Sequence, residues 1–214
     1  MNIVQEKKAR SPAMSPGRQA RGEKRRRIIF RALHDCILEK GYSNTTLADI
    51  AEQAGMSPSH LLYYFSGKEG ILEQYFATVA QWFLERVTAI SAEPVEQQPS
   101  LIAELWFAGD TSSNAEIGFM LECFGEAVHD GVMRDTKSLF DQQCKRFLER
   151  VFADAPMSGP ISQVDAAEIA YSLLIGLRNS VYFDSEVSPV SARRIFLHTI
   201  ENLKTVNAVS SPET

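Results

Sequence analysis

Residues 45–68 read Thr-Thr-Leu-Ala-Asp-Ile-Ala-Glu-Gln-Ala-Gly-Met-Ser-Pro-Ser-His-Leu-Leu-Tyr-Tyr-Phe-Ser-Gly-Lys. Apolar residues recur at helical spacing over residues 47–54, which predicts a helix with one apolar face. Thr45 or Thr46 can cap this helix, because a side-chain oxygen there accepts an unpaired backbone N–H. Gly55 can end it, since the left-handed conformation after a helix is least costly for glycine. The stretch therefore begins with a short helix and a tight turn.

A second helix is predicted after the turn. Ser57 or Pro58 opens it, because proline is tolerated in a first helical turn, and Leu61 and Phe65 hold it against the first helix. Its outward side chains are hydroxyls, an imidazole and phenols, with no acid among them: Ser57, Ser59, His60, Tyr63 and Tyr64. Such side chains reach base edges and phosphate oxygens in a major groove. This pattern favours a helix-turn-helix DNA reader over a plain helical hairpin of the core.

Charge is distributed unevenly along the chain. Residues 1–68 hold twelve Lys or Arg against six acids, whereas residues 69–214 hold ten against twenty-one, which gives the net charge of −5. An acidic protein is ordinarily repelled by DNA, so the position of the basic residues matters more than the total. The basic end is the end that carries the predicted DNA reader.

The N-terminal stretch is rich in Lys, Arg, Ser and Pro. It holds too few apolar residues to fold alone, so residues 1–22 are expected to form a disordered basic arm. The arm either contacts phosphates or a minor groove, or only keeps the chain soluble. Arg25 and Arg26, in the basic cluster that opens the next helix, are candidate DNA contacts.

The run from Arg26 to about Phe76 resembles the DNA-binding domain of TetR-type transcriptional regulators. The matching elements are Glu-Lys-Gly-Tyr at 39–42, Thr-Thr-Leu-Ala-Asp-Ile-Ala-Glu-Gln-Ala-Gly at 45–55, and Leu-x-Tyr-Tyr-Phe-x-x-Lys-Glu at 61–69. The family usually has tyrosine at the position of Leu62. The resemblance implies a DNA-binding domain, which we place at residues 23–68. Thr46 and Lys68 join its candidate DNA contacts, since Lys68 can reach a phosphate near a helix N-terminus.

Helical periodicity continues through the rest of the chain, and no β pattern appears, so an all-α fold is predicted. Helices are expected at about 68–91, 101–108, 114–130, 132–153, 165–184 and 189–206, with loops at 92–100 and 154–163. Residues 69–206 would form a larger domain for ligand binding and dimerisation, and residues 207–214 a flexible tail.

The helix expected at 165–184 is apolar nearly all round, so both of its sides should be buried. The last two helices therefore predict a homodimer through a four-helix bundle, in preference to a monomer with one internal helix. Small residues would allow close approach at Ala166, Ala167, Ala170 and Gly176. The family resemblance implies the same arrangement. Two recognition helices would then reach successive major grooves about 34–36 Å apart on a palindromic operator of double-stranded DNA.

The larger domain supplies aromatic and flexible side chains of the kind that line small-molecule pockets between helices. The candidate ligand contacts are Phe83, Trp106, Phe107, Met120, Phe124, Tyr171 and Arg178. Arg178 lies among apolar residues and needs solvent, a carboxylate such as Glu122 or Glu126, or the polar end of a ligand. The expected effector is small and hydrophobic or amphipathic.

Other classes of protein are less consistent with the sequence. No run approaches the ~18 apolar residues of a membrane span, and three widely spaced cysteines fit a reduced, cytoplasmic chain. Glu126-Ala127-Val128-His129 is half of a di-iron motif without a second copy, so neither an enzyme nor a cofactor or metal is expected. A ligand-responsive repressor is the prediction, repression being the family's habit. The alternative is a helical lipid- or cofactor-carrying protein that keeps the hairpin without binding DNA.

Overall fold

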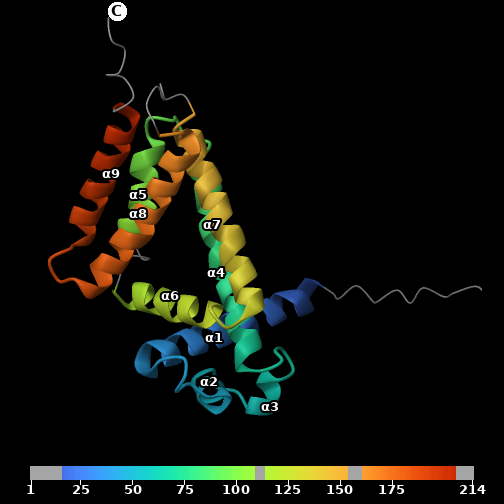
Figure 1. Ribbon diagram of the computed structural model, residues 1–214. Coiled ribbons are helices and arrows are strands. Elements are labelled where there is room, and N and C mark those ends of the chain that lie inside the picture. Colours follow the sequence, from blue (N-terminus) through green and yellow to red (C-terminus); the bar gives the residue numbers. More distant parts are fainter. Residues whose placement is uncertain (1–15, 109–113, 154–160, 206–214) are drawn as a thin grey trace, which may run out of the picture.

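A computed structural model of the chain describes residues 16–108, 114–153 and 161–205. Every regular element within these ranges is an α-helix, which confirms the predicted fold class (Figure 1). In chain order the helices are α1 (Pro16–Lys40), α2 (Leu47–Gln53), α3 (Pro58–Leu61), α4 (Lys68–Ile90), α5 (Gln98–Phe107), α6 (Asn114–Ala127), α7 (Gly131–Val151), α8 (Gln163–Phe183) and α9 (Pro189–Thr205).

Helices α1, α2 and α3, together with the first turns of α4, form one end of the molecule, which we call the head (Figure 1). Thr46 caps α2 by accepting from the Asp49 N–H, and Asp49 accepts from the Thr46 N–H in return, which completes a capping box. Gly55 has a φ of 64° and makes the turn. Ser57 caps α3 and Pro58 lies in its first turn, as predicted.

Helix α3 is shorter than the sequence suggests. It ends at Leu61, and the chain continues as a turn to Phe65. Leu61 and Phe65 are both buried in the head core, beside Ile50 of α2 and Ile29 of α1. The turn therefore keeps the predicted orientation of residues 59–64, although only part of the stretch is helical.

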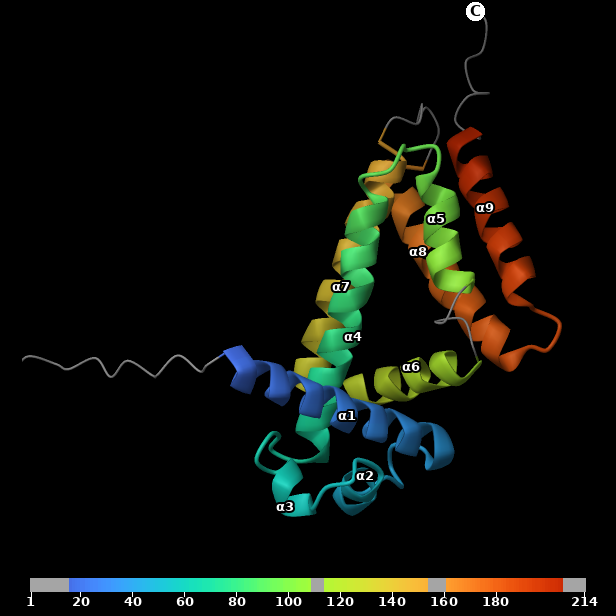
Figure 2. The same cartoon turned by 180° about the vertical axis from the view of Figure 1, so that it is seen from behind.

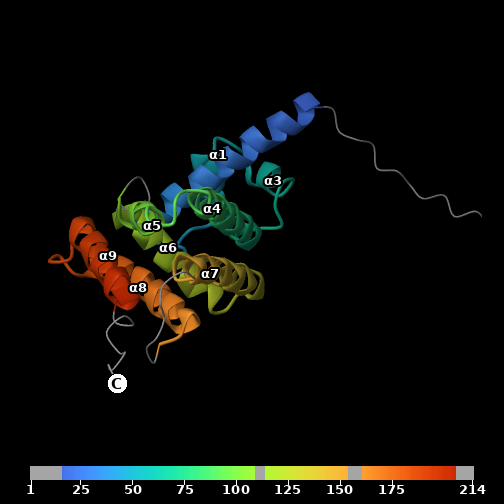
Figure 3. The same ribbon diagram turned by 90° about the horizontal axis from the view of Figure 1, so that it is seen from above.

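The remaining helices form the body. Helices α4 and α7 lie side by side, α5, α8 and α9 pack beside them, and α6 crosses the base of the body next to α1 (Figures 1 and 2). Viewed from above, α9 lies on the side of α8 away from α4 (Figure 3). The body core includes Trp106, Phe147 and Phe196, whereas Phe119 and Cys123 of α6 belong to the core of the head. Head and body are thus joined by packed apolar side chains.

Several helix ends differ from the predicted ones. Helix α5 begins at Gln98, because Pro99 occupies its first turn, where proline is tolerated. Ser162 caps α8 with a capping box to Asp165. Helix α1 begins at Pro16, so residues 16–22, expected in the basic arm, are helical. Residues 1–15, most of the predicted loop at 154–163 and the tail at 207–214 lie outside the described residues.

The small residues of α8 are used differently from the prediction. Ala166, Ala167 and Ala170 are fully buried inside this chain's own core, where they let neighbouring helices approach. Gly176 is exposed, and a Cβ added to it would meet no atom within 4 Å. Of the four residues expected at a subunit interface, only Gly176 therefore lies on an open face. Among the described residues, no helix is both long and apolar enough to cross a membrane.

Candidate functional site

The outer surface of the head carries most of the predicted DNA contacts. Ser59, His60 and Tyr63 are exposed, and Tyr64 is half-buried with its ring edge-on to Tyr63, at 5.1 Å between centroids. Leu62 is 53% exposed between them, and the sequence analysis did not assign it a role. A large apolar side chain exposed at this position is suited to contact a thymine methyl group. The polar side chains around it are suited to base edges and phosphates.

Two of the predicted DNA contacts hold the head together. The Thr46 hydroxyl accepts from the Asp49 N–H and donates to the Asp49 carboxylate at 2.6 Å. The Ser57 hydroxyl accepts from the His60 N–H at 3.2 Å. Both hydroxyls are therefore capping groups, which fix the direction of α2 and α3.

Two of the predicted basic contacts are held by other head residues. The Lys68 ammonium donates to the Tyr42 carbonyl at 3.0 Å, and Arg26 donates to the side chain of Gln74 and lies over the Phe65 ring. Arg25 is exposed on α1. Arg26 thus links α1 to α4, while Arg25 presents its charge outward.

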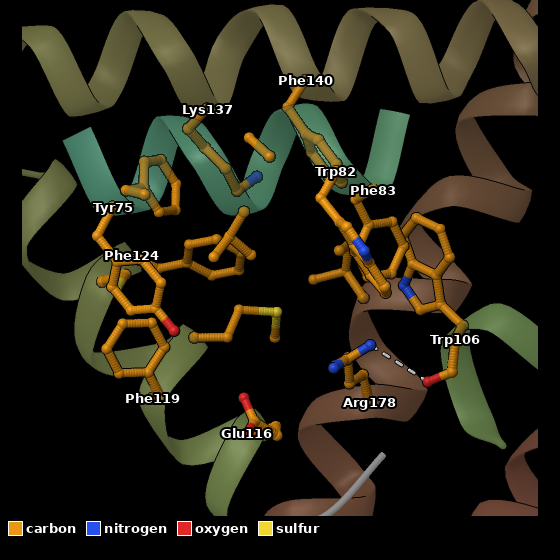
Figure 4. A pocket seen from close by; sticks show the side chains of 16 residues that line it. Tyr75, Trp82, Phe83, Trp106, Glu116, Phe119, Phe124, Lys137, Phe140 and Arg178 are labelled. Carbon is orange, nitrogen blue, oxygen red and sulfur yellow. Dashed lines mark hydrogen bonds between the residues drawn. The ribbon is translucent and has the colours of Figure 1, made fainter. Parts of the chain in front are cut away.

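A cavity of about 100 Å³ lies in the body between α4, α6, α7 and α8 (Figure 4). Of the predicted ligand contacts, Phe83, Trp106, Met120, Phe124 and Arg178 line it. The sequence analysis missed further lining residues, notably Tyr75, Trp82, Glu116, Phe119, Lys137 and Phe140. The apolar stripe of α4 carried the signal for Tyr75 and Trp82. Nothing local marked Glu116, whose partner His34 lies on another helix, or Lys137, which pairs with Asp141 of its own helix and meets Phe124 only through the packing of α6 against α7.

Three charged side chains line this otherwise aromatic cavity. Arg178 is 3% exposed and donates from Nη1 to the Trp106 carbonyl at 3.2 Å (Figure 4). Burial lowers the pKa of Arg178 to about 10, while Glu116 acts in the opposite direction, so the guanidinium stays charged at neutral pH. Lys137 lies 4.6 Å from the centre of the Phe124 ring and donates to both Asp141 oxygens at 2.6 Å.

The carboxylate that acts on Arg178 is therefore Glu116. The sequence analysis named Glu122 or Glu126 as a partner, but the Glu122 carboxylate instead accepts from the Tyr42 N–H at 3.1 Å. The three acids lie on one helix, α6, and only the packing of α6 against α1 and α8 decides which of them meets which partner.

Phe107 and Tyr171, two further predicted ligand contacts, do not line this cavity. Phe107 packs against Phe196 of α9, at 6.3 Å between ring centroids. The Tyr171 hydroxyl donates to Asp141, and burial raises the pKa of Tyr171. Both side chains point into helix interfaces on other sides of α5 and α8, a choice that helical periodicity leaves open.

Comparison with known proteins identifies the family. The profile described as "Bacterial regulatory proteins, tetR family" matches residues 29–75. The profile described as "BetI-type transcriptional repressor, C-terminal" matches residues 95–204. The chain belongs to the TetR family of bacterial regulatory proteins.

Individual relatives support this assignment. The chain is 24% identical over 193 residues to the HTH-type transcriptional regulator PksA of Bacillus subtilis, covering 85% of this chain and 90% of that protein. It is 25% identical over 155 residues to the regulator BetI of Escherichia coli strain UMN026, covering 71% and 78%. These relatives are named as transcriptional regulators, which is a non-enzymatic role.

Solved structures show the same fold. A transcriptional regulator from Pseudomonas aeruginosa PAO1 superposes with a TM-score of 0.76 at 15% identity, covering 86% of this chain and 91% of that one. A regulator from Saccharomonospora viridis, solved in complex with choline, superposes with a TM-score of 0.71 at 20% identity, covering 84% and 96%. With its head, its family and these relatives, the chain is a DNA-binding transcriptional regulator.

Proposed function

We propose that this regulator is a repressor that binds a palindromic operator as a homodimer and is released by a small, mostly apolar effector. One observation carries the proposal. Helix α4 is continuous from the head, where Ile71 and Leu72 are buried in the head core, to the cavity, which its residues Tyr75 to Phe83 line. A change at the cavity therefore has a direct mechanical path to the DNA-reading end.

Release follows from a shift in population. An effector that binds one conformer more tightly favours that conformer, and only to the extent of the difference in affinity. In the released conformer α4 swings, and the two heads of the dimer no longer match successive major grooves. The exposed side chains of Ser59 and His60 would read bases, while Tyr63, Tyr64, Lys68 and Arg25 would contact phosphates.

The cavity indicates the chemistry of the effector. Its mostly apolar lining favours an apolar body, and the buried Arg178 guanidinium supplies N–H donors, while the charge of Lys137 is paired with that of Asp141. We assign the effector a polar end that accepts hydrogen bonds, directed at Arg178. Choline carries a cation, which aromatic rings attract, whereas the Arg178 guanidinium opposes a cation placed beside it. An engineered apolar cavity of about 150 Å³ binds benzene, so an effector larger than benzene either displaces the walls of this cavity or extends out of its open side.

Dimerisation is supported by apolar side chains on the open faces of α8 and α9. Ile169 is 40% exposed, Phe183 76% and Val190 79%, and Ile195 is also exposed. Together with the open face at Gly176, they supply a surface for a bundle of two helices from each chain. On α8 the spacing of Ile169, Gly176 and Phe183 places them on one side of the helix, and exposed apolar side chains gathered on one face are typical of an interaction site.

Sequencing the genomic fragments that the purified protein retains tests the proposal. We expect a small set of fragments that share an inverted repeat, with affinity that falls steeply as salt rises. The complex of protein and operator is then titrated with compounds related to the neighbouring genes, with choline as a comparison. We expect the effector to release the operator DNA at saturating concentration. Fragments without a common site, or a site without two-fold symmetry, would contradict the dimeric operator model.

A further inference from the structure

His34 of α1 is a buried polar residue of the head, 6% exposed, and its ring contacts side chains of α4 and α6. Its Nδ1 lies 3.0 Å from the Tyr75 hydroxyl of α4. Its Nε2 lies 3.4 Å from the Glu116 carboxylate of α6, and its ring packs at a tilt of 36° against the Phe119 ring, at 4.5 Å between centroids. Tyr75, Glu116 and Phe119 all line the cavity. His34 does not line it, but each of these three neighbours does.

The neighbours of the two ring nitrogens favour one placement of the imidazole hydrogen. A carboxylate only accepts hydrogen bonds, so we assign the proton to Nε2, which faces Glu116, and Nδ1 then accepts from the Tyr75 hydroxyl. In this assignment Nε2 carries the hydrogen and faces Glu116, and Nδ1 accepts a hydrogen bond from Tyr75. Because hydrogen bonds weaken steeply with misalignment, a shift of α6 or α4 must either carry His34 with it or leave a buried polar group without its partner.

A second carboxylate of α6 also contacts α1, but away from the cavity. Glu122 accepts from the Tyr42 N–H at 3.1 Å, and its Oε1 lies next to Gly41, whose φ of 77° ends α1. Glu122 does not line the cavity. Helix α6, which lies next to α1 (Figure 2), thus contacts α1 through Glu116 and Phe119, which line the cavity (Figure 4), and through Glu122, which does not.

We propose that His34 is the residue through which the head senses the occupancy of the cavity, by way of Tyr75, Glu116 and Phe119. An occupant that fills the buried part of the cavity, about 100 Å³, presses on the lining side chains, because packed interiors have little spare volume. Displacement of Glu116 and Tyr75 moves the imidazole that they hold, and α1 moves with it. His34 is a positioning residue, whereas the contact between Glu122 and the Tyr42 N–H holds α1 to α6 without responding to the cavity. This inference rests on the proposed control of DNA binding by the cavity.

Filling the cavity by substitution tests both the control of DNA binding by the cavity and the role of His34, without a known effector. Ala80 lines the cavity from α4, and Ala80→Phe places a phenyl ring in it. The measurement is the affinity for a duplex that the purified dimer selects from random-sequence DNA. We expect Ala80→Phe to weaken this affinity at least about fivefold, the lower end of typical allosteric coupling. The smaller Ala80→Leu should weaken it less, and serves if the phenyl variant loses its cooperative thermal unfolding.

Double-mutant cycles then locate the coupling. In a His34→Phe background, which keeps the ring but removes both polar contacts, Ala80→Phe should change the affinity by less than about twofold. His34→Gln retains an amide donor toward Glu116 and should restore part of the effect. If His34 had only a structural role, His34→Phe would lower the DNA affinity equally with and without Ala80→Phe, and the effect of Ala80→Phe would be unchanged.

Matched variants on α6 complete the test. Glu116→Ala should abolish the response to Ala80→Phe, whereas Glu122→Ala, the same change on the same helix, should preserve it. An unchanged response in both the His34→Phe and Glu116→Ala backgrounds overturns the role of His34 but leaves control by the cavity intact. If the response is lost in the Glu116→Ala background but kept in the His34→Phe background, the role of His34 is also overturned, because Glu116→Ala enlarges the cavity itself. No effect of a folded Ala80→Phe dimer in the wild-type background overturns both proposals.

Discussion

The ammonium of Lys68, the first residue of α4, lies 3.0 Å from the carbonyl oxygen of Tyr42 and 4.1 Å from the centre of its ring. Tyr42 follows the end of α1, so this contact ties the start of α4 to the end of α1. An ammonium has three donors, and the side chain is only half-buried. Lys68 is therefore able to brace the head and to meet a phosphate at the same time.

Replacement of Lys68 tests the phosphate contact. We expect Lys68→Ala to weaken binding to a selected operator and to random duplex about equally, and to flatten the salt dependence by roughly one unit. Lys204→Ala, at the far end of α9, removes the same charge away from the head and should leave the slope unchanged. An unaltered salt slope in Lys68→Ala would leave Lys68 with the bracing role alone.

Base reading is expected from the exposed side chains around α3. Ser59→Ala, His60→Ala and Leu62→Ala should each reduce discrimination between operator and random duplex, by about 1–3 kcal/mol for a good base contact. Ser57→Ala is the matched control. It removes the α3 cap, so it should cost about 1 kcal/mol of stability and weaken both DNAs together. Equal losses on both DNAs for all three variants would contradict base reading by this surface.

The open face of α8 predicts a substitution that blocks assembly without disturbing the subunit. Gly176→Trp should give a folded monomer, because a Cβ at Gly176 meets nothing within 4 Å in this chain, while the indole would occupy the space of a partner. Gly125→Trp on α6 meets equally open space and should remain dimeric. Analytical ultracentrifugation distinguishes the two. A dimeric Gly176→Trp protein would place the subunit interface on another face.

The capping box of α2 predicts a pH dependence of head stability. The hydrogen bond from Lys40, followed by those from Thr46, lowers the pKa of Asp49 below its usual 3.8. A carboxyl with a lowered pKa in the folded state contributes stability above its unfolded pKa, and loses it as the pH falls. The full chain should therefore lose thermal stability toward about pH 3. Asp49→Asn should be less stable at neutral pH and lose less on acidification, and parallel curves for the two proteins would exclude this role.

Local sequence determined the parts of this protein that depend on neighbours along the chain. The Thr46 cap, the Gly55 turn, the Ser57–Pro58 helix start and the apolar spacing of Leu61 and Phe65 were all predicted, because they depend on backbone groups and side chains three or four residues apart. The same applies to the stripe of α4 that supplies Tyr75 and Phe83 to the cavity.

Only the tertiary structure decided which side chains meet across helices. Periodicity places Glu116, Glu122 and Glu126 on one helix without saying which is near Arg178, His34 or the Tyr42 N–H. Phe107 and Tyr171 are aromatic residues of the kind that often lines cavities, yet they face other helices. The physical reason is that a helix sequence fixes the direction of each side chain around its own axis, whereas the crossing and rotation of packed helices are set by the whole core.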